Sequence, residues 1–230
     1  MLNFSKMGLK IPTDYIICYD FSGNLIDKSL NLNHGIGTGS YSFVTGRKGI
    51  SNSAISFVNG IVETQSNVDL TNNDKITISF WWKPEVSSNA QCVLSHSDNF
   101  DNNNNSFGLT RNWAYQTYIS VIDHNGSYNF TQAGFTVAAP YSFSFDHVLI
   151  TIDRNFGVDE AKLFINNVEF GLAGFGGGYF NDLNGLFSSF KMCIGRRKSN
   201  SDLPYVGLMQ DFRLYNRILN RQEKMSLYNE

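Results

Sequence analysis

One segment carries the residue types that bind sugars, namely Arg111-Asn112-Trp113-Ala114-Tyr115-Gln116. Aromatic rings stack on the C–H faces of sugars, and planar polar side chains hydrogen-bond to their hydroxyl groups. We therefore predict a ligand face formed by Arg111, Asn112, Trp113, Tyr115, Asp123 and His124. The alternative is that Trp113 and Tyr115 only cap the core, because aromatic residues are also ordinary core and interface residues.

The side chains that nucleophilic catalysis needs are not arranged in a familiar pattern. The sequence has no G-x-S-x-G element, and no ordered Ser or Cys partner is evident for His34, His96, His124 or His147. The glycine-rich residues 174–180 lack the lysine and the following helix of a phosphate-binding loop. We therefore expect a protein that binds a ligand without transforming it.

The composition limits the classes of partner. Hydrophobic residues are 42% of the 230 residues, charged residues are 17%, and the formal net charge is −2. Such a chain is not a disordered tail, and it lacks the basic field that nucleic-acid binding requires. No run of 18 apolar residues and no signal-peptide pattern occur, so we expect neither membrane insertion nor signal-directed export.

Short apolar or alternating runs between polar turns indicate strands along most of the chain. Residues 75–83, KITISFWWK, place Ile76, Ile78 and Phe80 on one face, and Trp81 and Trp82 on opposite faces. One tryptophan is therefore expected in the core, and the other is expected to be exposed or covered by another strand. Further strands are expected at residues 15–20, 91–96, 106–110, 117–123, 127–131, 145–154, 186–195 and 205–215.

Asparagine pairs and glycines indicate the tight turns. We expect one hairpin of strands 54–58 and 60–64 about Asn59-Gly60, and another within residues 161–170 about Asn166-Asn167, because asparagine tolerates a positive φ. Residues 219–228 form the one good candidate helix. The pattern predicts an all-β, two-sheet sandwich with one domain at residues 14–230 and an extended arm at residues 1–13.

The three cysteines, Cys18, Cys92 and Cys193, are odd in number and widely spaced. This spacing matches no common metal-binding pattern. Each lies inside an apolar run, so we expect three buried thiols that act as small hydrophobic side chains.

A set of segments also follows one another in a characteristic order, at residues 19–35, 46–57, 76–83, 147–167 and 194–219. The most specific are the ITISFWWK strand and the stretch GLMQDFRLYNRIL at residues 207–219. Together they resemble the concanavalin A-like, laminin-G-like jelly-roll superfamily. The resemblance implies an all-β, two-sheet antiparallel jelly-roll sandwich with a short C-terminal helix.

Glycosidases of this superfamily use two carboxylates in an E-x-D-x-x-E pattern, which is absent here. A retaining glycosidase needs its two carboxyl groups about 5–5.5 Å apart. Asp159 and Glu160 are adjacent, and Asp146 and Asp153 are seven positions apart, so an extended chain places each pair on opposite faces. The resemblance therefore implies that the protein is not an enzyme. The alternative is that it is a divergent glycoside hydrolase.

Many relatives bind one structural Ca²⁺ ion through carboxylate and carbonyl oxygens, which suit this hard cation. The resemblance implies a site with side-chain ligands Asp27 and Asp211 and with Asn31 and Asn33 as carbonyl donors. Gln210 replaces one member of the family's acidic pair, which lowers the expected affinity. The alternative is an Asx-type turn at residues 27–33 that satisfies its own backbone.

The fold alone does not determine the function, because lectin, adhesion, virion and glycosidase domains share it. We expect a non-catalytic, lectin-like module that binds a glycan or a host-surface receptor. The asparagine-rich domain also resembles a bacteriophage virion component for host attachment. Such a subunit is expected at the virion surface, docked to other virion proteins through its arm in a symmetric oligomer.

Two other expectations remain open. A protein that is not carried on a virion would stay in the cytoplasm, because no export signal is evident. A purely structural assembly protein would bind no glycan and would instead expose a large apolar patch.

Overall fold

The computed structural model describes residues 10–85, 89–99, 104–111, 118–125, 130–136, 144–155, 161–172, 186–198 and 203–230. These parts of the chain are mostly strands. The strands are β1 (Ile17–Tyr19), β2 (Gly35–Val44), β3 (Ala54–Thr64), β4 (Val68–Asp69), β5 (Lys75–Pro84), β6 (Gln91–His96), β7 (Asn104–Arg111), β8 (Tyr118–Asn125), β9 (Phe130–Thr136), β10 (Asp146–Asp153), β11 (Ala161–Ile165), β12 (Val168–Phe170), β13 (Ser189–Phe190), β14 (Met192–Ile194) and β15 (Gly207–Tyr215). The chain ends in helix α1 (Arg221–Tyr228).

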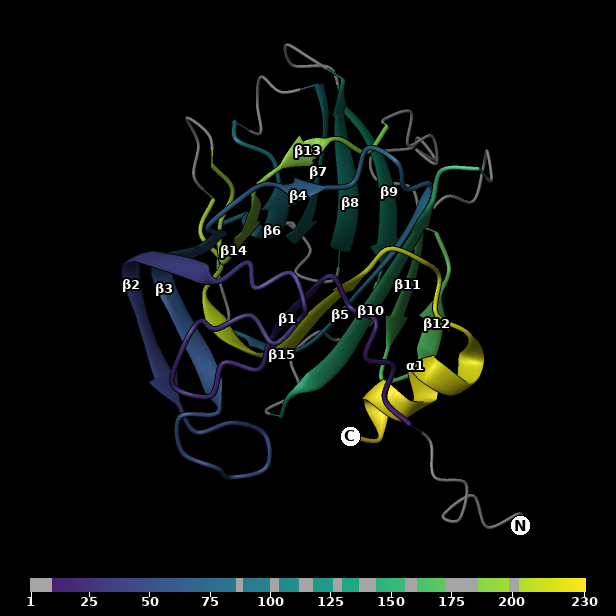
Figure 1. The fold of residues 1–230 in the computed structure, drawn as a ribbon. Coiled ribbons are helices and arrows are strands. Elements are labelled where there is room, and N and C mark those ends of the chain that lie inside the picture. Colours follow the sequence, from purple (N-terminus) through teal and green to yellow (C-terminus); the bar gives the residue numbers. More distant parts are fainter. Residues whose placement is uncertain are drawn as a thin grey trace, which may run out of the picture.

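The strands form two antiparallel layers that share one strand (Figure 1). The order of hydrogen-bonded neighbours is β12-β11-β10-β5-β15-β3-β14-β6-β7-β8-β9, with β1 beside β15 and β2 beside β3. Strand β3 pairs with β15 through residues 55–57 and with β14 through residues 62–63, so it passes from one layer to the other. A short second sheet pairs β4 with β13. This arrangement confirms the predicted jelly-roll sandwich with a short C-terminal helix.

The core lies between the layers and follows the predicted alternation. Ile76, Ile78 and Phe80 of β5 belong to one buried cluster together with Val148 and alternate apolar residues of β7, β8 and β10. Burial of this apolar surface is the main driving force that holds the two layers together, at roughly 25 cal/mol per Å².

The hairpin predicted about Asn59-Gly60 is wrong, because β3 runs without reversal from Ala54 to Thr64. A Cβ atom on Gly60 would lie 2.8 Å from the carbonyl oxygen of Ser40 in β2. Gly39, opposite Gly60, has a φ of +76°, and the register with β3 shifts just after it. The glycines therefore let the paired strands bulge and bend. Strand β2 itself was not predicted, because its glycines obscure the alternation.

The hairpin about Asn166-Asn167 is confirmed. These residues have φ values of +50° and +63° and connect β11 to β12. Positive φ at both central residues is the requirement of the turn type that matches the twist of the flanking strands.

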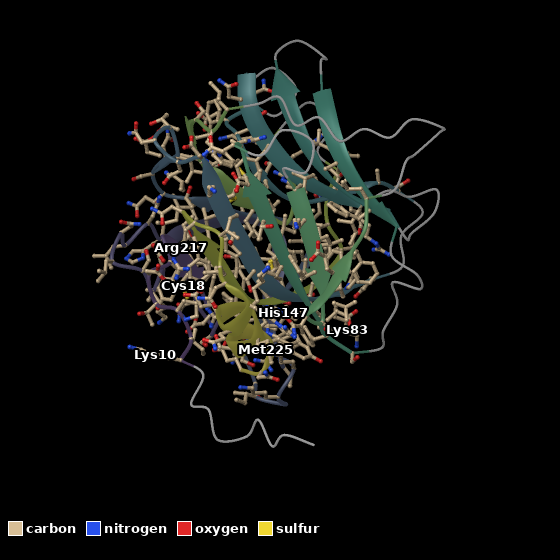
Figure 2. All side chains as sticks on the ribbon, turned by 90° about the vertical axis from the view of Figure 1, so that its right-hand side faces the viewer. Lys10, Cys18, Lys83, His147, Arg217 and Met225 are labelled. Atoms are coloured by element: carbon tan, nitrogen blue, oxygen red, sulfur yellow. The ribbon has the colours of Figure 1, made fainter. Side chains whose placement is uncertain are left out.

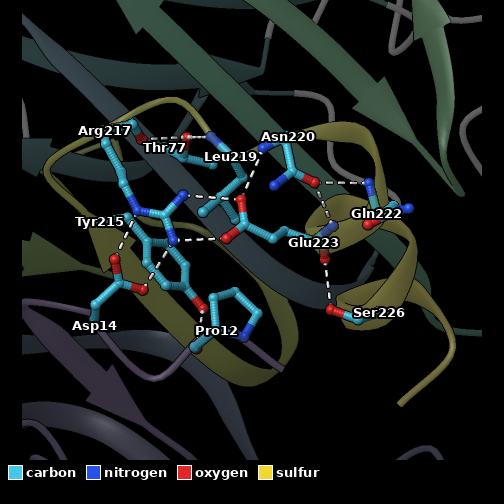
Figure 3. A network of polar contacts seen from close by, with 10 residues as sticks. All are labelled: Pro12, Asp14, Thr77, Tyr215, Arg217, Leu219, Asn220, Gln222, Glu223 and Ser226. Carbon is cyan, nitrogen blue, oxygen red and sulfur yellow. Dashed lines mark hydrogen bonds and ion pairs between the residues drawn. The ribbon is translucent and has the colours of Figure 1, made fainter. Parts of the chain in front are cut away.

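Helix α1 is fixed by a capping box and by a network of polar contacts (Figure 3). The side chain of Asn220 accepts hydrogen bonds from the backbone N–H groups of Gln222 and Glu223, and Glu223 accepts one from the backbone of Asn220. Arg217 donates to both Asp14 and Glu223, and hydrogen bonding to Arg217 lowers the pKa of both carboxyl groups. This network joins the chain entering β1 to the start of the helix.

The outer face of β5 is covered by the helix and by an arginine. Trp82 lies in the core, whereas Trp81 is buried against Tyr228 of α1, with ring centroids 6.0 Å apart. The guanidinium of Arg47 lies 4.2 Å from the centroid of Trp81, and His147 packs beside it. Figure 2 shows His147 against the yellow helix. Trp81 is therefore covered by a helix and a loop rather than by another strand.

The three cysteines are free and buried, as predicted. Burial raises the pKa of the Cys18 thiol to about 11 and that of Cys193 to about 12. Because the thiolate is the reactive form, these thiols are chemically quiet at neutral pH.

The predicted arm at residues 1–13 lies largely outside the described residues. Within the part that is described, Ile11 packs against the cluster that contains Leu149 and Leu227. The carbonyl oxygen of Pro12 accepts a hydrogen bond of 3.2 Å from the Tyr215 hydroxyl. The end of the arm therefore lies on the domain.

Candidate functional site

A polar cavity of about 420 Å³ lies between the β1–β2 connection, the segment around β4, and the residue after β15. Its lining contains the asparagines Asn31, Asn33, Asn67, Asn73 and Asn216. Ser66 and Asp69 are also polar, and Ile16, Leu32 and Val68 supply apolar surface. We call this cavity the amide pocket. Its volume lies within the range of small-molecule sites, roughly 300–1,000 Å³.

A buried carboxylate builds the first wall of the pocket. Asp27 is 1% exposed, and its Oδ1 atom accepts hydrogen bonds from the backbone N–H groups of Cys18 (2.8 Å) and Ser29 (2.9 Å). Its Oδ2 atom accepts hydrogen bonds from the Ser29 hydroxyl (2.6 Å) and the Asn33 N–H (2.9 Å). An ionised carboxylate has about four acceptor positions. The loop of residues 27–33 therefore folds around the side chain of Asp27.

The tip of this loop has an unusual backbone. Leu32 has a φ of +50°, which is uncommon for a non-glycine residue, and its side chain is 63% exposed. Backbone strain of this kind persists where the surrounding structure enforces it, and it is concentrated at binding sites. Here the Asp27 hydrogen bonds on either side of the tip hold the strained residue at the pocket.

The second wall of the pocket is formed by residues 66–69. A pair of hydrogen bonds between an amide side chain and the backbone joins it to the loop of residues 27–33. The Asn33 side chain donates to the carbonyl oxygen of Ser66 (2.9 Å) and accepts from its N–H group (2.8 Å). The Tyr19 hydroxyl donates to the carbonyl oxygen of Asn33 at 2.6 Å. The two walls are thus preorganised, which reduces the entropy that a ligand must lose on binding.

Three further polar side chains of the lining are partly committed. The amide nitrogens of Asn31 and Asn67 donate to the carbonyl oxygens of Ile16 (2.9 Å) and Ser189 (3.0 Å), which leaves the oxygen and one N–H of each amide for a ligand. Asp69 Oδ1 accepts two hydrogen bonds from Thr71, which lower the pKa of Asp69.

Two lining amides are uncommitted. The side chains of Asn73 and Asn216 make no hydrogen bond within the parts of the chain that the structure describes. Each can therefore both donate to and accept from a bound molecule.

The predicted ligand face is only partly described. Asn112, Trp113 and Tyr115 lie outside the described residues, and Asp123 and His124 lie in β8 with side chains that are also outside them. Arg111, at the end of β7, is 3% exposed and donates to the carbonyl oxygen of Glu85 (3.0 Å) and to Gln91 (3.1 Å). Arg111 thus ties together neighbouring strands, and a ligand face in this segment stays a prediction.

The four predicted calcium ligands are placed in two regions. Asp27, Asn31 and Asn33 share one loop, whereas Asp211 lies in β15, where its Oδ2 atom is 3.8 Å from the Arg47 guanidinium. Burial raises the pKa of Asp211 to about 6. Among the described residues, no group of three His, Cys, Asp or Glu side chains is arranged to hold a metal ion. Calcium binding stays a prediction.

Most of the amide pocket was missed from the sequence. Residues 66–73 read SNVDLTNN, which is also the composition of a surface turn, and Asn216 lies far away along the chain. The only available signal was a high density of asparagine at residues 31–33 and 66–73. The β-sheet topology brings these segments together.

Comparisons with solved structures show the same fold. Domain 4 of the GH43 extracellular arabinanase AbnA from Geobacillus stearothermophilus, in complex with arabinotriose, is 18% identical, with a TM-score of 0.66 over 94% of this chain and 98% of that domain. The binding domain of botulinum neurotoxin serotype D is 15% identical, with a TM-score of 0.66 over 95% of this chain. The chain spans about half of that toxin domain, 52%.

Within the described residues, no helix combines the length and the apolar character that a bilayer crossing requires.

Sequence comparison adds the family. No curated protein matches the chain. Residues 58–223 match the family model described as the concanavalin A-like lectin/glucanases superfamily, and this match covers well over half of the 230 residues. The chain therefore belongs to the concanavalin A-like lectin/glucanases superfamily.

Proposed function

We propose that the protein is a non-catalytic carbohydrate-recognition domain whose ligand occupies the amide pocket. The observation that carries this proposal is a preformed cavity lined by five asparagines together with a serine and an aspartate. Amide groups match vicinal sugar hydroxyls, because each amide can both donate and accept a hydrogen bond. Ile16 and Leu32 offer apolar surface to the C–H groups of a sugar ring.

The structural neighbours support this class of ligand. The arabinanase domain was crystallised with a trisaccharide, and the toxin domain is a binding domain. We propose attachment to a glycan-bearing cell surface, as in a virion attachment protein, as the setting of the present domain.

The charges of the lining support a binding role over hydrolysis. Among the described residues that line the amide pocket, Asp69 is the only carboxylate. A glycosidase of the usual type needs a second carboxyl group across the scissile bond, about 5–9.5 Å away.

A glycan array probed with the full chain tests the proposal. The double variant Asn73→Ala/Asn216→Ala removes the two uncommitted amides and should lose most of the signal. Asn59→Ala removes an exposed amide that does not line the pocket, and it should bind as the wild type does. The absence of any glycan signal from folded protein, or an unchanged signal from the double variant, would contradict the proposal.

The segment of residues 111–116 offers a competing site on the same protein. Trp113→Ala separates the two sites, because it should abolish binding only if the aromatic segment holds the sugar. The amide pocket predicts that Trp113→Ala retains glycan binding.

A structural assembly role is the second candidate, and exposed apolar side chains favour it. Leu30 is fully exposed, Leu32 is 63% exposed, and Ile26 is 46% exposed, all on one loop. Exposed apolar side chains that adjoin one another are typical of interaction surfaces, and this loop is where such a surface would form. Light scattering should then show an oligomer that Leu30→Ser weakens, whereas a wild-type monomer would argue against assembly through this loop.

A further inference from the structure

We infer that the amide pocket selects neutral, hydroxyl-rich sugars and rejects sugars that carry a carboxylate or a sulfate. This inference rests on the proposed function and adds the chemical class of the ligand. It follows from the charges of the lining, from the pairing of the neighbouring cations, and from the balance of hydrogen-bond donors and acceptors.

The charge of the lining is negative. Asp69 is the only ionisable residue among the described residues that line the pocket. Its carboxylate is exposed, and the two hydrogen bonds from Thr71, at 2.7 and 3.0 Å, favour its ionised form. An anionic group in the pocket would therefore meet a like charge and no compensating cation.

Two cations that lie close in sequence to lining residues are already committed. Arg217, next to Asn216, is held by two carboxylates, those of Asp14 and Glu223. Lys75, two residues after Asn73, forms a 2.8 Å ion pair with Asp153. Releasing either cation to a bound anion would break an existing pair.

The histidine behind β4 is also unable to supply a positive charge. His96 is fully buried, and its Nε2 atom lies 2.9 Å from the carbonyl oxygen of Val68, a lining residue. Burial lowers the pKa of His96 to about 4, so it is neutral at pH 7. Arg217, Lys75 and His96 therefore supply no free positive charge to the pocket.

The hydrogen-bonding groups favour a ligand that both donates and accepts. One N–H of each of the Asn31 and Asn67 amides is occupied, so each residue presents an oxygen atom and one further N–H, whereas the Asp69 carboxylate presents only acceptors. A sugar hydroxyl can donate to such an oxygen and accept from Asn73 or Asn216. Carboxylate and sulfate oxygens only accept, which leaves the acceptors of the lining unpaired and costs affinity.

The test uses an array of neutral glycans printed beside their sialylated, uronate and sulfated counterparts. Neutral glycans should give the signal, and each acidic counterpart should bind at least about tenfold more weakly, a difference near 1.4 kcal/mol. A preference for acidic glycans would overturn this inference and leave the proposed function standing. No glycan signal from folded protein would overturn both.

A matched pair of variants tests the charge argument. Asp69→Asn keeps an oxygen for Thr71 but removes the charge. The ratio between the binding of the best neutral glycan and the binding of its acidic counterpart should therefore fall several-fold. Asp20→Asn makes the same change at another surface turn, where Asp20 accepts from the Ser22 N–H at 3.0 Å, and it should leave the ratio unchanged. An equal ratio in wild type and Asp69→Asn would refute the inference.

A chelator distinguishes direct recognition from recognition through a bound cation, because carboxylate and amide oxygens also suit calcium. Binding of the best neutral glycan should be the same in EDTA and in calcium. Loss of that binding in EDTA would overturn the inference that the sugar hydroxyls contact the lining directly.

Discussion

The substitution Asp27→Asn should destabilise the protein and open the amide pocket. The Asp27 Oδ1 atom would remain an acceptor for the Cys18 and Ser29 N–H groups. The new amide nitrogen would replace Oδ2, which now accepts from the Ser29 hydroxyl at 2.6 Å and from the Asn33 N–H at 2.9 Å. A donor would then face two donors inside the loop.

The magnitude follows from these two hydrogen bonds. Hydrogen bonds to a charged group contribute roughly 1.5–3 kcal/mol each, and rotation of the Ser29 hydroxyl recovers part of the loss. We therefore predict a decrease of about 3 kcal/mol in the free energy of unfolding. With a urea slope of roughly 3 kcal/mol per M for a large domain, the midpoint should fall by about 1 M.

Urea unfolding followed by circular dichroism measures this decrease. Asp20→Asn is the matched control, because Asp20 also accepts a backbone hydrogen bond two residues along the chain but is partly exposed. The control should change stability by less than about 0.5 kcal/mol. A decrease below about 1 kcal/mol for Asp27→Asn, or one equal to the control, would refute the claim that Asp27 organises the loop.

Three further predictions concern stability. Burial raises the pKa of Asp211 to about 6, well above the usual range of an aspartate, so folding takes up a proton at mildly acidic pH and the charged group costs stability above pH 6. Asp211→Asn should raise the free energy of unfolding at pH 7 by about 2 kcal/mol, because asparagine is uncharged and tolerates the φ of +54° at this position. The gain in stability should vanish near pH 4. A gain that is independent of pH would contradict this reasoning. Leu227→Ala, at a fully buried position of α1, should cost about 3 kcal/mol in urea unfolding, and a cost below about 1 kcal/mol would mean that the helix is not docked. The calcium site implied by the family resemblance predicts that millimolar calcium raises the thermal midpoint above that of chelated protein, and equal midpoints would argue against it.

Much of the fold could be predicted because local alternation determines which face of a strand is buried. Ile76, Ile78 and Phe80 have the two-residue period of a half-buried strand, and they lie in the core. The Asn166-Asn167 turn was equally readable, because asparagine is one of the few residues that adopt a positive φ at low cost. The ordered family segments then fixed the type of sandwich.

The errors occurred where tertiary contacts override a local signal. Asn59-Gly60 has the composition of a hairpin turn, but in the structure Gly60 is needed for close approach to Ser40 at the bend of β3. Asp27 is not such an error: the turn expected at residues 27–33 agrees with its hydrogen bonds to the Ser29 and Asn33 N–H groups, and its role as a calcium ligand stays a prediction. The lining of the amide pocket comes from distant segments, so the asparagines at residues 31–33 and 66–73 could not by themselves show that these segments meet.

The central claim is that a sugar occupies the amide pocket, and a crystal structure of the protein with its best array glycan tests it most directly. The account predicts a sugar ring in the cavity, with its hydroxyl groups hydrogen-bonded to Asn31, Asn73 or Asn216. A sugar bound against the segment of residues 111–116, with the amide pocket holding only water, would contradict it.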